Sequence, residues 1–562
     1  MAYMRDIART QIGKIIEDAF SKTLGMQGSR LPEITIEVPK EKSHGDFSTN
    51  IAMVLAGQAR MAPAKIASLL VEGMQIGDSY IESVEWAPPG FINFCMSDQW
   101  LYEGLEEVIR QGSSYGSSDM GKGRKVMVEF VSANPTGPLH MGNARGGALG
   151  DLIAKVLEKS GYEVTKEFYV NDAGNQIEKF GLSLEARYLQ EKLGEDRVEF
   201  PADGYQGEDI REHVLEYIRS GQEDLMDKPS EERRRILVDD ALPRNIGNMK
   251  KTLGRYGIEY DVWFSEKILH ESGDVQKAID YMKEKGHTVE YDGALWLKGP
   301  AMGVEKDEVL VRGNQIPTYF AADIAYHWNK FHERGFHRVI DLLGADHHGH
   351  VQRMKGAVEC IGIDRERIDI VVFQLVRLLR NGEVARMSKR TGKAITLEDL
   401  LDEVGVDAAR FFFNTKSSGS HLDFDLDLAV RKSNENPVFY VQYAHARICS
   451  MLRILNEEGC DLDRHPETID LTLLSMSQEK DLIRKLCEYP DELTASALTL
   501  EPSRLTRYVV DLAGLFHSFY NACRLKGEEE PLLYARLSLV KAVKTVIGNV
   551  LEVLSIQAPE KM

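Results

Sequence analysis

Cysteine is scarce in this sequence, and its spacing excludes its usual structural roles. Six cysteines are scattered through 562 residues, and none forms a Cys-x-x-Cys pair. Neither a zinc ribbon nor a disulfide framework is expected, and a reducing compartment fits best. The sequence also lacks a run of 18 apolar residues that could span a membrane, and its first residues lack the apolar segment of an export signal. We therefore expect a cytoplasmic protein without a membrane partner.

Positive charge is also in short supply. Lysine and arginine number 69 against 88 aspartate and glutamate residues, which leaves a formal net charge of −19 at pH 7. This balance excludes a protein that coats nucleic acid without specificity, so any RNA partner must meet local basic patches. Basic residues gather in two stretches, from Arg233 to Arg255 and from Arg377 to Lys393. Solvated helix faces are the plainer interpretation of the first stretch but not of the second.

The length and the pattern along the chain predict several domains. A chain of 562 residues is too long for one core and indicates about three or four domains. Residues 1–115 mix helical and strand patterns, which predicts a small α/β domain. Residues 116–430 alternate strands and helices, which predicts a Rossmann-like parallel sheet with a helix-rich insertion at about 181–285. Residues 431–562 form long amphipathic helices, so the fold class is multidomain α/β with a C-terminal all-α helical bundle.

The segment from Lys125 to Asp151 carries the clearest chemical signal. Its first residues, from Lys125 to Val131, are mostly apolar and predict a short buried strand, which the Gly/Pro-rich stretch from Ser132 to Pro138 breaks. Apolar residues at helical spacing follow at once, so His140 would lie at a helix N-terminus. Free backbone N–H groups and the positive end of the helix dipole favour phosphate oxygens there. The succession predicts a nucleotide-phosphate site.

A second loop with chemical content runs from Arg380 to Lys393. It follows a strand expected from Val371 to Leu379 and bears five positive side chains and a serine. A mobile cationic loop can close over a polyphosphate and neutralise the charge that develops during transfer. For the loop alone, an exposed basic turn is an equally good interpretation. The phosphate site upstream favours the functional one.

These two segments resemble the paired signature motifs of the class I aminoacyl-tRNA synthetases. His-Ile-Gly-His corresponds to His140–Asn143, and Lys-Met-Ser-Lys-Ser corresponds to Arg386–Arg390. Asn143 cannot become a cation as the second histidine can, and Arg386 keeps the charge of lysine without its compact ammonium. Other stretches narrow the resemblance to arginyl-tRNA synthetase and span the chain in that family's order: HGDFSTNIAM, PGFINF, VEFVSANPTGPLHMGN, YVNDAGNQ, DVWFSE, PTYFAADIAYH, YVQYAHARI and the ending APEKM.

The resemblance implies an arginine–tRNA ligase. The arginine carboxylate would attack the α-phosphate of ATP to give arginyl-adenylate and pyrophosphate, and arginine would then pass to the 3′-terminal ribose of its tRNA. Such chemistry is mostly positioning and charge stabilisation. The implied catalytic residues are His140, Gly142, Asn143 and Lys389, and the ATP contacts add Pro138, Arg386, Met387 and Ser388. Mg²⁺ would accompany ATP, and no structural metal is expected.

The stretch that begins at Tyr319 suits a guanidinium substrate, which needs acceptors matched to its fork of donors. Asp323 supplies a carboxylate and Tyr319 a phenolic oxygen, and their i, i+4 spacing puts both on one face if residues 319–328 are helical. Without context, a surface salt bridge and core packing would be the plainer roles of these two residues. The resemblance reverses both interpretations and implies these arginine contacts: Glu129, Asn134, His140, Glu266, Tyr319, Asp323 and His347.

The histidines of GADHHGH, from Gly344 to His350, could indicate a metal site. No cysteine pair and no His-Glu-x-x-His spacing lies nearby, and isolated histidines at a strand end are more often scaffold or substrate contacts. We therefore expect no metal there.

The resemblance also implies that tRNA contacts the N-terminal domain and the C-terminal bundle. Aromatic stacking on unstacked anticodon bases would suit Tyr520, although burial is the commoner role of a single aromatic residue in a bundle. We expect a monomer. The implied tRNA contacts are Gln442, Tyr443, His445, Arg447, Tyr520 and Met562.

Two alternatives of other classes are open at this point. A tRNA-independent adenylate-forming enzyme would not need the N-terminal domain or residues 432–562. A catalytically silent RNA-binding paralogue would be expected to lose His140, Lys389 or Asp323, and all three are present.

Overall fold

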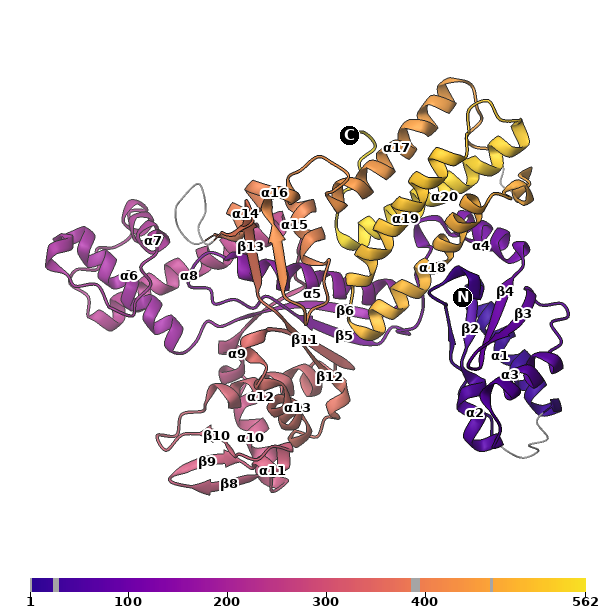
Figure 1. Ribbon diagram of the computed structural model, residues 1–562. Helices are drawn as coiled ribbons and strands as arrows, with labels where there is room; N and C mark the ends of the chain where they lie inside the picture. Colours follow the sequence, from indigo (N-terminus) through magenta and orange to yellow (C-terminus); the bar gives the residue numbers. More distant parts are fainter. Residues whose placement is uncertain (1–2, 24–29, 386–394, 465–467) are drawn as a thin grey trace.

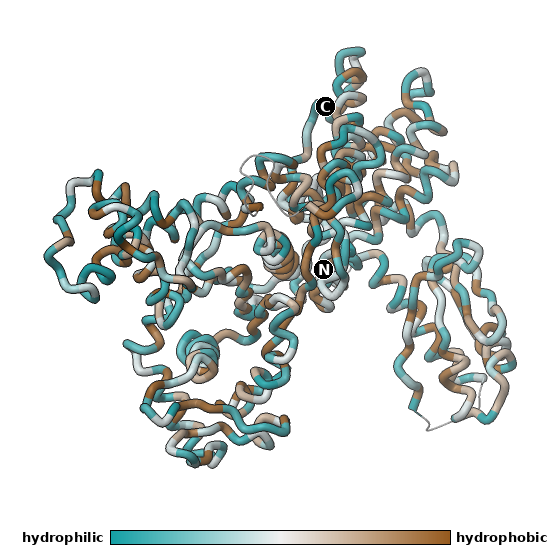
Figure 2. The backbone as a smooth tube through the Cα atoms, turned by 60° about the vertical axis from the view of Figure 1, so that its left-hand side comes forward, coloured by the Kyte–Doolittle hydropathy of each residue, from teal (hydrophilic) through white to brown (hydrophobic). Residues whose placement is uncertain are grey.

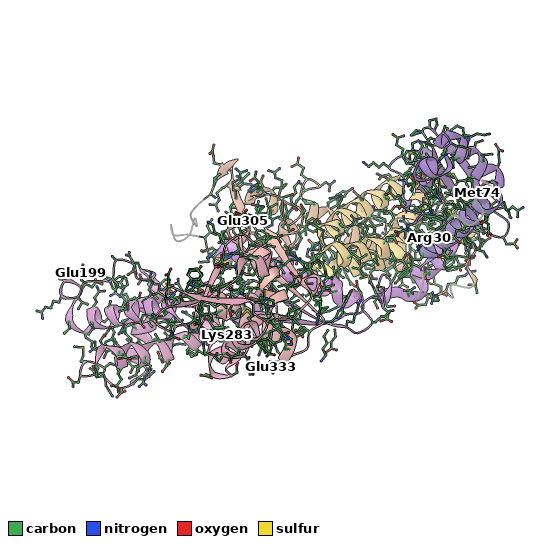
Figure 3. The ribbon with its side chains drawn as sticks, turned by 90° about the horizontal axis from the view of Figure 1, so that it is seen from below. Arg30, Met74, Glu199, Lys283, Glu305 and Glu333 are labelled. Atoms are coloured by element: carbon green, nitrogen blue, oxygen red, sulfur yellow. The ribbon has the colours of Figure 1, made fainter. Side chains whose placement is uncertain are left out.

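The computed structural model describes residues 3–23, 30–385, 395–464 and 468–562. The molecule is elongated, with a helical projection at one end and the N-terminal domain at the other (Figure 3). Glu199 marks the projection in that view, and Met74 marks the N-terminal domain. The catalytic sheet lies between these two ends.

The N-terminal domain is built on an antiparallel sheet of order β1-β2-β4-β3. Phe47 and Phe94 are fully buried on this sheet, where the helices of the domain pack. The α/β character predicted for the first domain is therefore confirmed. Its elements are α1 (Met4–Thr23), β1 (Ile36–Glu37), β2 (Phe47–Thr49), α2 (Ile51–Ala59), α3 (Pro63–Gly73), β3 (Ile81–Ala87), β4 (Phe91–Met96) and α4 (Asp98–Gln111).

Five parallel strands form the central sheet, in the order β12-β11-β5-β6-β7. The order along the chain reverses between β5 and β11, which is the Rossmann pattern predicted from the sequence. In such sheets ligands bind at the C-terminal ends of the strands that flank the reversal. The strands are β5 (Lys125–Glu129), β6 (Glu163–Val170), β7 (Val262–Ser265), β11 (Arg338–Gly344) and β12 (Ile368–Phe373).

Two excursions leave this sheet. Helices α6 (Asn175–Leu193), α7 (Glu208–Arg219) and α8 (Ser230–Arg255) form the projection, which stands apart on the left of Figure 1. The sheet then resumes at β7, where Trp263 stacks on Phe168 of β6 with ring centroids 4.3 Å apart. The interval expected as one insertion at 181–285 is thus interrupted by a strand of the central sheet.

The second excursion lies between β7 and β11 and carries a small sheet of order β10-β9-β8. It leads into α12, so the condition that residues 319–328 are helical is met. Its elements are α9 (Glu266–Glu271), α10 (Asp274–Glu284), β8 (Thr288–Tyr291), β9 (Ala294–Leu297), α11 (Gly299–Met302), β10 (Glu308–Val311), α12 (Tyr319–Trp328) and a π-helical turn (Asn329–Glu333).

The strand expected from Val371 to Leu379 is divided. β12 ends at Phe373, and β13 (Val376–Arg380) belongs to a separate three-stranded sheet with β14 (Glu383–Val384) and β15 (Leu422–Asp425). The buried guanidinium of Arg145 donates to the carbonyl of Gln374 at the division, at 2.7 Å. A continuous strand would use that carbonyl in its ladder, so the side chain of α5 (Met141–Lys159) replaces the ladder bond.

The remaining helices complete the catalytic domain and the bundle. Figure 2 shows apolar residues gathered where the long C-terminal helices meet, and Leu512 and Val543 are fully buried there. The predicted helical bundle is confirmed. No helix in the described part of the chain is long and apolar enough to cross a membrane. These helices are α13 (His350–Cys360), α14 (Leu397–Val404), α15 (Val406–Phe413), α16 (Leu426–Ala429), α17 (Pro437–Glu457), α18 (Ser477–Thr499), α19 (Ser503–Ala522) and α20 (Glu530–Leu554).

Candidate active site

His140 is the N-cap of α5, and the helix start itself orients its imidazole. The backbone N–H of Gly142 donates to His140 Nδ1 (3.1 Å), and the backbone N–H of His140 donates to Asn143 Oδ1 (3.2 Å). Since Nδ1 accepts, the neutral ring carries its proton on Nε2, which can donate to a phosphate oxygen. Burial lowers the pKa of His140 and favours that neutral form. Asn143, the departure from the family motif, thus completes a capping box.

A cavity of about 410 Å³ lies between this helix start and the β12–β13 division. Gly142 is required at its edge, because a Cβ there would lie 2.8 Å from the His140 ring. No aspartate or glutamate is among the described residues that line it. The lining consists of His140, Met141, Gly142, Phe373, Gln374, Leu375, Val376, Arg377, Leu378, Val384, Ala385 and Ile395.

The described residues on either side of the segment that holds the second signature motif line this cavity. Arg386, Met387, Ser388 and Lys389 lie outside the described residues, and their neighbours Ala385 and Ile395 both line the cavity. The chain beyond the motif is joined to the first motif, because Met141 N–H donates to the Ile395 carbonyl at 3.1 Å. The first motif and the described residues that precede and follow the second therefore line one cavity.

The predicted arginine contacts lie around the C-terminal end of β5 and on α12. Tyr319 and Asp323 are one turn apart on α12. Tyr319 is 52% exposed, and the side chain of Asp323 is 42% exposed. Desolvation by the surrounding protein raises the pKa of Asp323 to about 7, and the carboxylates of Glu129 and Glu266 act in the same direction. An open acceptor with so high a pKa is suited to a cationic partner.

Glu266, at the start of α9, is almost fully buried. Burial raises its pKa. Asn171 is oriented so that its amide nitrogen donates to Glu266 Oε2 at 2.9 Å, and its other amide atom lies 3.3 Å from the side chain of Asn134. Asn171 therefore connects two of the predicted contacts, although only its presence in YVNDAGNQ pointed to it.

A buried lysine that was not predicted from the sequence contacts Glu129, one of the predicted arginine contacts. Lys330 Nζ donates to Glu129 Oε2 (2.7 Å) and Asp341 Oδ1 (2.8 Å), and its side chain is fully buried. Burial disfavours its charge, but the carboxylates of Asp341 and Glu129 outweigh burial and raise the pKa of Lys330. His327 Nε2 lies 2.9 Å from the other oxygen of Asp341. Lys330 follows Asp323 by seven residues, a helical spacing that was available in the sequence.

His347 and His350, both in the histidine-rich segment from Gly344 to His350, have different surroundings. His347 is exposed beside Asp346, with Nε2 and Oδ2 3.4 Å apart, whereas His350 Nε2 lies 3.6 Å from Asp323 Oδ2. Burial lowers the pKa of His350 to about 4, so it is neutral at pH 7. Within residues 3–23, 30–385, 395–464 and 468–562, no group of three or more His, Cys, Asp or Glu side chains is arranged to hold a metal.

On the bundle, Arg447 lies between two aromatic rings. Its guanidinium carbon is 4.6 Å from the ring centroid of Tyr443 and 4.7 Å from that of Tyr520. Tyr520 and Met562 are well exposed. Gln442 is half-buried and donates to Asp407 Oδ2 at 2.8 Å.

His445 differs from the other residues expected to contact tRNA. Its side chain is only 4% exposed, and its Nδ1 lies 2.9 Å from the Pro559 carbonyl. The ring is covered by the C-terminal tail and does not face the surface. The tRNA contact expected of His445 stays a prediction, and the structure shows that the ring also contacts the C-terminal tail.

The basic stretch from Arg233 to Arg255 lies on α8, and acidic residues neutralise much of it. Arg233 pairs with Glu185 at 2.7 Å, Arg244 with Glu216 at 2.8 Å, and Arg255 with Asp402 at 2.6 Å. The stretch fits the plainer interpretation, a solvated helix surface, on which these arginines form ion pairs with acidic residues.

Comparison with known protein families shows which family has this fold and these motifs. Residues 9–96 match the family model "Arginyl tRNA synthetase N terminal domain", and residues 104–425 match "tRNA synthetases class I (R), catalytic domain". The chain belongs to the arginyl-tRNA synthetases. Residues 441–562 of this synthetase match "DALR anticodon binding domain".

Relatives and solved structures agree with that assignment. The synthetase is 61% identical to "Arginine--tRNA ligase" of Acetivibrio thermocellus over 100% of both chains, and 59% identical to that of Ruminiclostridium cellulolyticum over 99% of both. A "putative arginyl t-RNA synthetase" structure from Campylobacter jejuni is 32% identical, with a TM-score of 0.75, over 83% of this chain and 100% of the other. The Thermus thermophilus arginyl-tRNA synthetase structure, 22% identical, shares the fold with a TM-score of 0.76 over 99% and 100%.

The arginyl-tRNA synthetase is an ATP-dependent arginine–tRNA ligase, as predicted from the sequence. Its match to an anticodon-binding model argues against a tRNA-independent adenylate-forming enzyme, which would not need the bundle.

Proposed function

We propose that this synthetase selects arginine with an acidic pocket formed by the carboxylates of α12 and α9. Asp323 and Glu266 would accept the guanidinium N–H groups, and the Tyr319 hydroxyl would add a further acceptor. The observation that carries this proposal is the set of carboxylates that surrounds a partly open Asp323 at the sheet's reversal point. A guanidinium stays charged at all relevant pH values, and carboxylates match its geometry. His347 stays a predicted contact at the rim.

The other end of the substrate would meet β5 and the turn after it. We propose that Glu129 accepts from the α-ammonium group and that Asn134 contacts the carboxylate end. Lys330 and Ser132 hold the Glu129 carboxylate, at 2.7 and 3.0 Å. The carboxylate of arginine would then face the helix start at His140, where ATP is proposed to bind.

ATP would occupy the 410 Å³ cavity, with its phosphates at the N-terminus of α5. Pro138, His140, Gly142 and Asn143 would contact ATP at the helix start, and Arg386, Met387, Ser388 and Lys389 are the further proposed ATP contacts. His140 Nε2–H would donate to a phosphate oxygen, and Lys389 would stabilise the charge that develops on pyrophosphate as the arginine carboxylate attacks the α-phosphate. Mg²⁺ would be held mainly by the phosphates, because the described lining contains no carboxylate.

Arginine affinity should fall as pH decreases below about 7. The free Asp323 carboxyl has a pKa raised to about 7, so below that pH arginine must displace a proton to bind. We expect log Kd to rise by up to about one unit per pH unit below 7 and to level off above it. Isothermal titration with arginine from pH 5.5 to 8.5 measures this, and Asp323→Asn should bind weakly without the pH step. A flat profile in the unmodified enzyme would rule out this role of Asp323.

We propose that Tyr443, Arg447 and Tyr520 form a stacking surface for anticodon bases, with Gln442 and Met562 nearby. Arg447 keeps the two tyrosines apart and supplies positive charge. Arg447→Ala should raise the KM for tRNA about tenfold and leave arginine and ATP KM unchanged, because stacking is worth about 1–3 kcal/mol per base. Arg453→Ala, on an exposed part of the same helix, is the control. Equal tRNA kinetics in the two variants would remove Arg447 from the interface.

We further propose a cytoplasmic monomer, since the candidate ATP, arginine and anticodon sites all lie within one chain. The domain boundaries at residues 115 and 430 stay predictions. Light scattering at assay concentrations measures the oligomeric state.

A further inference from the structure

The helical projection carries a buried amide that reaches into the active-site domain. Asn245 of α8 is 4% exposed, and its Nδ2 donates to the carbonyl of Pro135 at 3.1 Å. Pro135 lies in the turn between β5 and α5, one residue beyond the proposed substrate contact Asn134. Because proline has no N–H, this carbonyl is its only backbone hydrogen-bonding group. The contact therefore joins the projection to the turn that bears the substrate contact.

A histidine fixes the direction in which this amide points. His213 Nε2 of α7 lies 2.6 Å from Asn245 Oδ1, and His213 is also buried. An amide oxygen can only accept, so the ring must donate from Nε2, and the amide nitrogen is left facing Pro135. The His213 ring packs edge-on against Phe180 of α6, with centroids 6.4 Å apart. Phe180 of α6, His213 of α7 and Asn245 of α8 thus form a chain of contacts that ends at the Pro135 carbonyl.

The turn that receives this bond has an unfavourable backbone. Val131 and Ser132 have φ values of 69° and 41°, in the left-handed region that residues other than glycine rarely adopt. For the β-branched Val131 this conformation is particularly costly, and it persists only where surrounding contacts enforce it. The first half of the turn is enforced by the Ser132 hydroxyl, which donates to Glu129 Oε1 (3.0 Å) and accepts from Tyr169 N–H (3.1 Å). Asn245 is the corresponding contact on the second half.

We propose that Asn245 and His213 form a brace by which the projection positions the 131–137 turn for arginine. Asn245 is a positioning residue, since it acts through the Pro135 carbonyl on Asn134. The proposal rests on the proposed role of Asn134 at the carboxylate end of arginine. It gives the projection a role within the synthetase itself, in setting the place of the amino-acid carboxylate relative to ATP.

Asn245→Asp is the sharpest test, because it keeps an acceptor for His213 and replaces the donor to Pro135 with a repelling oxygen. Arginine-dependent ATP–pyrophosphate exchange, measured with tRNA present, should lose at least about tenfold in kcat/KM for arginine, while the KM for ATP stays within about twofold. His213→Leu should act in the same direction. His213→Gln, which places an N–H donor near the position of Nε2, should restore most of the activity.

Asn248→Ala, an exposed amide on the same helix, is the matched control and should behave as the unmodified enzyme. Thermal melting shows whether each variant is folded. Unchanged arginine kinetics in Asn245→Asp, or equal losses for arginine and ATP in folded variants, would overturn the brace. Failure of the proposed function is distinguishable: if Asn134→Ala leaves arginine kinetics intact while Asn245→Asp does not, Asn245 still positions the 131–137 turn, but the substrate contact in that turn is not Asn134.

Discussion

Replacing Asp323 with lysine should abolish arginine activation and leave ATP binding intact. The substitution removes the acceptor proposed for the guanidinium and sets an ammonium group in its place. An ammonium group in direct contact with the guanidinium would cost several kcal/mol through like-charge repulsion. We therefore expect kcat/KM for arginine to fall by at least about 10³-fold. Arginine-dependent ATP–pyrophosphate exchange measures the loss. Calorimetric titration with ATP measures what is retained, because the cavity lined by His140 is separate from α12.

Glu271→Lys is the matched control for this substitution. Glu271 is exposed at the end of α9, the helix that begins with Glu266, so the same charge change is made near the pocket but outside it. Its exchange kinetics should stay within about twofold of the unmodified enzyme, because isolated surface charges contribute little. If Asp323→Lys and Glu271→Lys gave the same arginine kinetics, Asp323 would have no place in the pocket.

Replacing Lys330 with methionine should destabilise the catalytic domain strongly. The fully buried ammonium lies between Glu129 and Asp341, and its removal leaves two buried carboxylates without it. Loss of one partner of a buried pair typically costs about 3–5 kcal/mol, which corresponds to a fall in melting temperature of roughly 6–20 °C. Differential scanning calorimetry measures this fall. In the fraction that remains folded, the KM for arginine should rise, because Glu129 loses the contact that orients it.

The control for Lys330 is Lys283→Met on α10 of the same domain. The Lys283 side chain is 44% exposed and pairs at 3.6 Å with Glu290, whose side chain is 75% exposed. An exposed pair contributes about 0–1 kcal/mol, so the melting temperature should change by no more than about 4 °C. If Lys330→Met and Lys283→Met had the same melting temperature, the buried lysine would not hold the two carboxylates.

Local patterns in the sequence were sufficient to predict the strand and helix start on which the proposed phosphate site is built. The apolar run before Ser132 and the helical spacing after His140 correctly placed β5 and α5, and the spacing of Tyr319 and Asp323 correctly placed both on one helix. Such features depend on neighbours within one or two turns, which a single sequence displays directly. The sequence placed Asn143 at the start of a helix, but its hydrogen bond in the capping box could be seen only from the side-chain geometry.

Features that depend on distant segments were missed. Lys330 follows Asp323 at a helical spacing, but its partners come from β5 and β11, and no spacing within its own segment indicates them. The division between β12 and β13 depends on Arg145, a residue 228 positions before Phe373 that replaces a ladder bond. The return of the chain at β7 depends on pairing with β6, so the interval 181–285 could not be recognised as interrupted from its helix-rich composition.

The most direct test of the account is the preference of the unmodified synthetase for arginine over citrulline. Citrulline has the same length and shape, but its ureido group is neutral, so it cannot pair with the Asp323 and Glu266 carboxylates. In ATP–pyrophosphate exchange with tRNA present, we predict a ratio of kcat/KM values of at least about 10³ in favour of arginine, since a site left with unpaired polar groups rejects such analogues strongly. A ratio within about tenfold would contradict the claim that the acidic pocket at α12 and α9 selects the substrate.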